Sequence, residues 1–221
     1  MKEFIQYIPE YLLKESGKVF YSGRNAFTGK KKIYVLGANP GGDSRTETHK
    51  TVESHNNFVL SQKPNWSSYI HESWRGKPPG EFRFPKRVIY LFNRLNLNPY
   101  EVPSSNVVFR RTPRVSGIRR RDPIWNDCWK FHEKVIEKLG IETVLCFGRD
   151  AERVVCKKTN ANNLIDISEE ENGRKWATRV FTNKSGFLVV SLTHPSIVKW
   201  DSEAADPTPF IKKILQERNI I

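Results

Sequence analysis

Cysteine, acidic residues and long apolar segments are all scarce in this sequence. The 221 residues include three cysteines, Cys128, Cys146 and Cys156. An odd number without paired spacing argues against a disulfide framework and against a zinc ribbon. No apolar run approaches the ~20 residues of a membrane-spanning helix, and the N-terminus lacks the features of a signal peptide. We therefore expect a soluble, intracellular protein that does not contact membranes.

Acidic residues are outnumbered by basic ones. The chain has 24 Asp and Glu against 37 Lys and Arg, which gives a formal charge of +13 at pH 7. Hydrophobic residues make up 38%, enough for a packed core and too many for a disordered chain. An excess of positive charge of this size favours a polyanionic partner, and nucleic acid is the first candidate.

Short apolar runs alternate with helical patterns along the whole chain. The runs at 33–37, 106–109, 143–147 and 187–192 are apolar on both faces, which is typical of buried parallel strands. The segment 177–182 precedes a turn and predicts an antiparallel hairpin with the last run. The pattern predicts an α/β fold, with helices on both sides of a mainly parallel, four-stranded sheet.

Helical spacing is clearest in four segments. We predict helices over 84–96 and 123–139, a shorter one from about 150, and a last one over 208–218. The stretch 43–83 is polar and has little periodicity, so it reads as a long loop or insertion. The prediction is one domain, 1–221, in which 43–83 is a binding loop, a lid or a disordered insertion.

Glycines and an asparagine follow the first strand, in the sequence Gly37-Ala38-Asn39-Pro40-Gly41-Gly42. Ligands bind at the carboxyl ends of strands in open α/β sheets, and glycine lets the backbone approach them closely. The motif lacks a glycine at Asn39 for a Rossmann fingerprint and a lysine after Gly42 for a P-loop. The alternative is a tight turn in which Asn39 caps its own backbone.

Two further polar motifs belong to other strands. His194, in Thr193-His194-Pro195-Ser196, ends the last strand and would share the sheet edge with Asn39. Asn106 stands among apolar residues, so its amide must pair with loop backbone or read the edge of a base. Asn39 or His194 alone could be a satisfied structural group; the two together at one sheet edge favour a site.

Arginines are concentrated after Asn106. The guanidinium fork matches phosphate oxygens, so their density favours phosphate contact over a merely solvated face. The residues are Arg110, Arg111, Arg114, Arg119, Arg120 and Arg121.

Together these motifs resemble the uracil-DNA glycosylase superfamily. Gly37 to Gly41 is similar to its Gly-x-Asn-Pro-Gly motif and His194 to Ser196 to its His-Pro-Ser motif. The stretch from Asn106 to Pro113 and the later segment 144–151 look like its thermophile-type branches. The resemblance covers most of the chain in the right order and implies a uracil-DNA glycosylase-like, three-layer α/β/α fold.

The resemblance also implies roles for individual residues. Asn39 would position the attacking water, and His194 would donate a hydrogen bond to the leaving base. The residues that bind the base would be Gly37, Ala38, Pro40, Asn106 and Phe58. The residues that bind DNA would be Gly41, the six arginines, Ser196, Ile197 and Val198. Of these, Ile197 and Val198 would insert into the base stack. The implied protein is a monomeric, monofunctional enzyme that acts on a damaged base in single- or double-stranded DNA, in the cytoplasm or on a bacterial nucleoid.

The chain also departs from the family. The iron–sulfur branches use four cysteines, so we expect no cluster, no other cofactor and no metal. The usual stacking aromatic has no clear match after Gly42; Phe58 is the nearest, with Trp66 and Trp74 behind it. Two alternatives remain: a catalytically silent nucleic-acid-binding protein of the same fold, and a metal-dependent nuclease that uses Asp43, Glu47 and His49.

Overall fold

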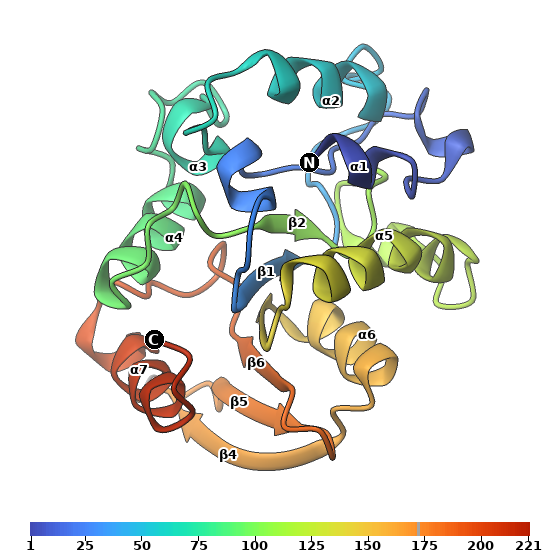
Figure 1. Ribbon diagram of the computed structural model, residues 1–221. Coiled ribbons are helices and arrows are strands. Elements are labelled where there is room, and N and C mark those ends of the chain that lie inside the picture. Colours follow the sequence, from blue (N-terminus) through green and yellow to red (C-terminus); the bar gives the residue numbers. More distant parts are fainter. Residues whose placement is uncertain (172) are drawn as a thin grey trace.

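A six-stranded mixed sheet forms the centre of the computed structural model, which describes residues 1–171 and 173–221 (Figure 1). The strand order is β2-β1-β3-β6-β5-β4. The α/β class is therefore as predicted, whereas a four-stranded sheet is wrong. Four parallel strands do lie side by side, but β5 and β4 extend the sheet by antiparallel pairing.

The strands match the apolar runs of the sequence with one addition. Their bounds are β1 (Ile33–Gly37), β2 (Ser104–Asn106), β3 (Thr143–Phe147), β4 (Asn163–Glu169), β5 (Ala177–Thr182) and β6 (Leu188–Leu192). The antiparallel β5–β6 hairpin is confirmed. Strand β2 begins and ends earlier than the predicted 106–109, and β4 was not predicted. Because β1, β2, β3 and β6 are parallel, their carboxyl ends lie along one edge of the sheet.

In the part of the chain that the structure describes, the four predicted helices are present together with three other α-helices. The α-helices are α1 (Lys2–Ile5), α2 (Val52–Ser61), α3 (Ser68–His71), α4 (Arg83–Arg94), α5 (Ile124–Leu139), α6 (Arg149–Thr159) and α7 (Thr208–Glu217), and the 3₁₀ turns are η1 (Glu10–Leu12), η2 (Arg24–Phe27), η3 (Val115–Gly117) and η4 (Glu203–Ala205). Helix α5 ends at Gly140, which adopts the left-handed conformation (φ 71°) that glycine tolerates best.

Two hydrophobic clusters lie on opposite faces of the sheet. Alternate residues of β1 divide between them: Tyr34 and Leu36 belong to one cluster, Ile33 and Val35 to the other. Helices α1, α5 and α6 contribute to the first cluster, and α4 and α7 to the second. This burial on both faces explains why the central strands are apolar without alternation.

The segment 43–83 is not one irregular loop. It contains α2, whose buried residues Val52, Asn56 and Val59 recur at helical spacing, and the short α3. Thr51 caps α2 by accepting a hydrogen bond from the backbone N–H of Ser54 (3.1 Å). The polar composition of α2, which includes the buried Asn56, hides this narrow buried stripe from a reading of the sequence.

An extended N-terminal segment, residues 16–23, lies beside the outer edge of β2. The Tyr21 N–H donates to the Ser104 carbonyl (2.9 Å), and the Lys18 N–H donates to the Phe109 carbonyl (3.0 Å). These bonds satisfy part of an edge that would otherwise expose unpaired backbone groups. They also fix the position of Lys18.

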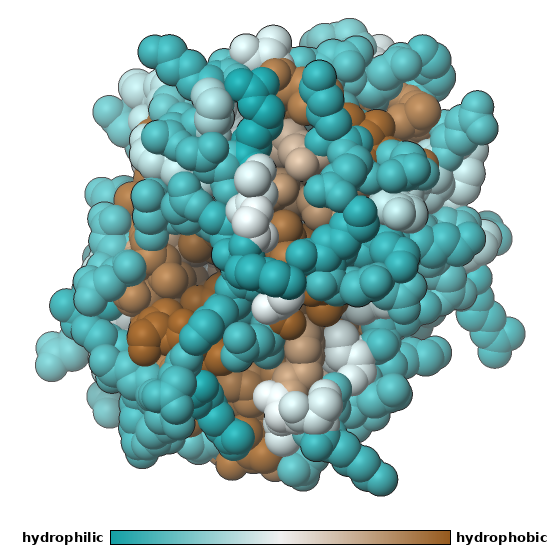
Figure 2. All heavy atoms as spheres, viewed as in Figure 1, coloured by the Kyte–Doolittle hydropathy of each residue, from teal (hydrophilic) through white to brown (hydrophobic). Residues whose placement is uncertain are grey.

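The surface is mostly hydrophilic on the face shown in Figure 2, with hydrophobic residues in patches between the polar ones. One such patch is at the lower end, where β4 and β5 lie in Figure 1. Leu164, Ile165 and Ile167 of β4 are among the exposed large hydrophobic residues. Within residues 1–171 and 173–221, every helix is too short or too polar to cross a bilayer.

Candidate functional site

A cavity of about 1130 Å³ opens at the carboxyl edge of the parallel strands. Asn39 follows β1, Asn106 ends β2 and His194 follows β6, and all three line this one cavity. The prediction that Asn39 and His194 would share one edge of the sheet is therefore confirmed, and Asn106 joins them because β2 ends at this residue instead of beginning there. The strand order alone brings together residues that are far apart in the sequence.

The side-chain amide of Asn39 is held in one orientation. Its Nδ2 donates to the Pro40 carbonyl (3.0 Å), the Thr112 carbonyl (3.3 Å) and Thr112 Oγ1 (2.8 Å). Carbonyl oxygens only accept, so the atom that faces them must be the NH₂ group. Among the residues that the structure describes, Oδ1 of Asn39 has no hydrogen-bond donor. It is therefore available in the cavity as an acceptor.

Asn106 is buried, and its amide is only partly satisfied. Nδ2 has no hydrogen-bond partner within the described residues, although it lies near enough to Tyr21 to oppose the rise that burial causes in the pKa of that phenol. Gly37 is the register partner of Asn106 in the β1–β2 ladder. A buried donor without a partner costs free energy, so this atom points to a ligand that accepts from it.

Gly37 is required by the position of Asn106. A Cβ at residue 37 would lie 2.2 Å from Asn106 Oδ1, so Gly37→Ala is expected to displace the amide. A displacement of about 1 Å costs about 100-fold in rate at catalytic sites, and we expect a loss of that size in any single-turnover reaction to which the Asn106 amide contributes. The control is Gly117→Ala, whose Cβ would be no closer than 3.5 Å to another atom. Equal rates for the two variants would remove Asn106 from the site.

His194 is a neutral hydrogen-bond donor. Its Nδ1 accepts from the Ser196 N–H (3.2 Å) and lies 2.7 Å from Ser196 Oγ. A backbone N–H can only donate, so the ring proton is on Nε2. Burial lowers the pKa of His194 to about 4. At pH 7 the site therefore offers an uncharged Nε2–H group.

Helix α4 supports the loop that carries His194. Arg87 donates to the Pro195 carbonyl, and the ring of Phe84 lies 5.4 Å from the His194 ring. Trp74 stacks on Phe84, with ring centroids 5.2 Å apart and planes at 16°. Phe84 and Trp74 both line the cavity, so this wall presents aromatic faces beside His194.

Phe58, the stacking residue suggested by the sequence, is on α2 at another part of the cavity wall. Its side chain is 45% exposed and meets Trp66 edge-on. Phe84 was missed because it begins an amphipathic helix and reads there as a core residue.

The six arginines have different environments. Arg110 is paired with Glu15 and lies 3.7 Å from Asp122, and it is outside the cavity. Arg111 bonds the Gly41 carbonyl and Ser16 Oγ, and it lines the cavity with Arg114. Arg119, Arg120 and Arg121 are exposed, and no ion pair involves them within the described residues. These three are free to meet a phosphate backbone, whereas Arg110 is already neutralised.

The other predicted residues also differ in access. Ala38, Gly41, Ser196 and Ile197 line the cavity, and Ile197 is 60% exposed. Pro40 is buried and outside the lining; its carbonyl holds Asn39. Val198 is buried in the core, so the prediction that it inserts between bases is wrong. Of the two residues predicted to insert, Ile197 is the exposed one.

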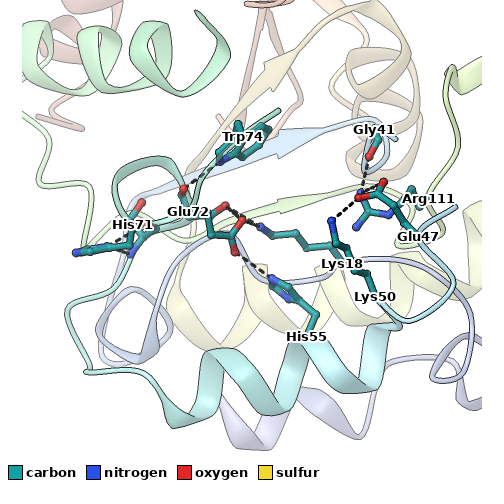
Figure 3. Close-up of polar contacts among 11 residues, drawn as sticks. Lys18, Gly41, Glu47, Lys50, His55, His71, Glu72, Trp74 and Arg111 are labelled. Carbon is teal, nitrogen blue, oxygen red and sulfur yellow. Dashed lines mark hydrogen bonds and ion pairs between the residues drawn. The ribbon is translucent and has the colours of Figure 1, made fainter. Parts of the chain in front are cut away.

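A charged cluster that the sequence did not indicate lies in the same cavity wall (Figure 3). Lys18, His55 and Glu72 come from three separate segments, and His55 and Lys18 both bond the Glu72 carboxylate. No spacing in the sequence predicts this contact, because only the tertiary fold brings the three residues together.

The three nuclease candidates do not form a metal site. Asp43 pairs with Arg45, and Glu47 pairs with Lys50 and Arg111. No group of three or more metal-ligating side chains is placed to hold an ion anywhere in 1–171 or 173–221.

Comparison with known proteins adds no assignment: no family model and no curated protein matches this chain.

Proposed function

We propose that the chain is a DNA glycosylase that hydrolyses the N-glycosidic bond of a damaged or deaminated base, uracil or a related one. The observation that carries the proposal is the meeting of Asn39, Asn106 and His194 in one cavity, each with an unused hydrogen-bonding atom. We further propose that the fold is the three-layer, uracil-DNA glycosylase-like arrangement expected from the motifs.

Each unused atom suits one part of the reaction. Breaking the glycosidic bond places positive charge on the deoxyribose and negative charge on the departing base. Asn39 Oδ1 would orient a water toward C1′, which an electrophilic sugar cation needs more than deprotonation. His194 Nε2–H would bond the base oxygen as charge develops there, and the Asn106 amide would read the base edge.

The nucleotide must leave the duplex to reach these groups. We propose that Phe84 stacks on the extruded base, since it contacts His194 and lines the cavity. Ile197 would occupy the gap in the stack. The reaction so described uses no metal and no lysine, so the proposed enzyme is monofunctional.

The test is a panel of oligonucleotides that carry uracil, hypoxanthine or a mismatch, incubated with the protein in EDTA. The proposal expects alkali-labile abasic sites for at least one base. Binding without base release across the panel would favour the catalytically silent alternative. Strand scission that requires added metal would favour the nuclease.

Replacing Arg119, Arg120 and Arg121 with alanine should flatten the salt dependence of DNA binding. Removing one arginine–phosphate interaction with duplex DNA lowers the slope of log K against log salt by about 0.9. The matched control replaces Lys30, Lys32 and Lys184, which removes the same charge near the amino ends of β1 and β6, at the opposite edge of the sheet. Equal slopes in the two triple variants would show that the arginine loop is a solvated surface that makes no specific contact with phosphates.

A further inference from the structure

Strand β4 forms an edge of the sheet and exposes large hydrophobic side chains. It is the last strand in the sheet order, so one of its sides pairs with β5 and, within the described residues, no strand pairs with the other. Leu164, Ile165 and Ile167 are exposed, and the Ile167 N–H donates to the side chain of Asp166 (2.8 Å). Proteins commonly protect such an edge with lysine or proline, and β4 contains neither.

A β-bulge brings two of these side chains to the same face of the sheet. Leu164 is the register partner of Phe181 and Ile167 is that of Arg179, whereas Ile165 has no partner. Phe181 and Arg179 are two residues apart on β5, so they and the residues opposite them share a face. Phe181 packs against the hydrophobic cluster to which α6 contributes. Helix α6 packs on β3 and β6, while β4 packs mainly with β5. Leu164 and Ile167 therefore extend this apolar face beyond the helix.

The charge of β4 is opposite to that of the whole chain. Residues 163–171 contain four acidic residues and no basic one, although the formal charge of the chain is +13. Three of the four are consecutive at the carboxyl end of the strand, where they begin with the exposed Glu169. Before the strand, α6 ends with Lys157 and Lys158, of which Lys157 is exposed. The edge therefore has a basic end and an acidic end.

We propose that β4 pairs with β4 of a second copy of this chain, antiparallel and about a two-fold axis perpendicular to the sheet. Antiparallel pairing places the carboxyl end of each strand beside the amino end of the other. The acidic end of each copy then meets the basic end of its partner, and the symmetry makes this contact twice. The same axis keeps Leu164 and Ile167 of both copies on one face, where they cover each other. Parallel pairing would bring the acidic ends together.

The proposed dimer has one continuous sheet, and its two cavities open in opposite directions. Strand β4 runs parallel to β6, because both pair antiparallel with β5. The carboxyl end of β4 is therefore at the cavity edge of the sheet, and the two-fold axis reverses this direction in the second copy. Both cavities stay open, so the dimer does not depend on the glycosylase proposal. It replaces the monomer that the resemblance implies.

The test is the molar mass in solution, measured by sedimentation equilibrium over a range of concentrations. One chain has a mass of 25.7 kDa, and the proposal expects the measured mass to rise toward that of two chains. A contact between two edge strands is at the small end of stable interfaces, so we expect a Kd of about 1–100 μM. The mass of one chain at every concentration up to about 1 mM would overturn the inference and leave β4 to a different partner.

Ile167→Lys places a charge in the middle of the proposed interface. The two-fold axis introduces it twice, so we expect the Kd to rise about 100-fold or more. The matched control is Ile221→Lys, which makes the same change at a residue of similar exposure (40% against 45%) and should leave the Kd unchanged. Since Ile167 is exposed, the variant should keep the Tm of the parent protein. Equal Kd values for the two variants would overturn the inference.

Charge reversal tests whether the partner is a second copy. Lys157→Glu or Glu169→Lys alone places like charges at both ends of the interface, so each should raise the Kd about threefold to tenfold. The double variant restores opposite charges in every chain and should recover most of the parent affinity. Only a contact between the acidic end of one copy and the basic end of another predicts this recovery. Additive losses in the double variant would overturn the inference.

Discussion

Replacing His194 with alanine is expected to slow base release about 100- to 1000-fold, the usual cost of removing one preorganised donor to a developing anion. The structure gives the donor a defined form, because Ser196 occupies Nδ1 and leaves the proton on Nε2. The measurement is the single-turnover rate on the base identified by the lesion panel. Ser196→Ala is the matched variant: it removes the hydroxyl contact but keeps the backbone N–H, so its effect should be much smaller.

The pH dependence separates a neutral His194 from a cationic one. The pKa of His194 is lowered from 6.5 to about 4, so the neutral donor predominates from pH 5 upward and protonates only as the pH falls through about 4. Release should therefore be nearly constant between pH 5 and pH 8. An acidic rise with a midpoint near 6.5 that disappears in His194→Ala would show that the imidazolium is the active form.

Asn39→Ala is expected to lower base release by about 100-fold or more, because the attacking water loses the oxygen that orients it. Asn39→Asp provides a sharper comparison. It keeps one oxygen toward the cavity but turns the other toward the Pro40 and Thr112 carbonyls, which only accept. We expect this variant to be impaired as well. Full activity in Asn39→Asp would mean that residue 39 acts as a general base rather than as a fixed amide.

Thr112 is a positioning residue for Asn39. Its hydroxyl donates to the Arg114 carbonyl (2.8 Å) and accepts from Asn39 Nδ2 (2.8 Å). Thr112→Val keeps the shape and removes this link, so we expect about tenfold slower release, comparable to the net contribution of one hydrogen bond. In the Asn39→Ala background the same substitution should have no further effect, which a purely structural role would not predict.

Local sequence patterns were sufficient to predict the elements whose buried residues follow a regular spacing. Strand β1 and helix α5 have their apolar positions within one short segment, so their periods are legible. Strand β4 has no such pattern, because Leu164, Ile165 and Ile167 face solvent at the edge of the sheet. Helix α2 was missed for a related reason: only a narrow stripe of it is buried.

Some residues of the candidate site could likewise be predicted from the sequence, and others could not. Asn39 and His194 could be placed together in advance, because parallel strands bring their carboxyl ends to one edge. Asn106 could not be placed there, because the predicted strand 106–109 begins at this residue, whereas β2 ends at it. Lys18, His55 and Glu72 could not, since their contact depends on how the N-terminal segment and α2 pack. Nor could the neutralisation of Arg110, because Glu15 lies far from it in the sequence.

The pairing of Gly37 with Asn106 in the β1–β2 ladder also fixes the position of the Asn106 side chain. Successive side chains of a strand point to opposite sides of the sheet, so a slip of β2 by a single position would exchange Asn106 for Ser105 or Val107. The hydrogen bonds that build the sheet thus also determine where the side-chain amide of Asn106 lies. Substitutions, insertions or deletions in the connection before β2 leave the position of Asn106 unchanged only if the register between β1 and β2 is kept.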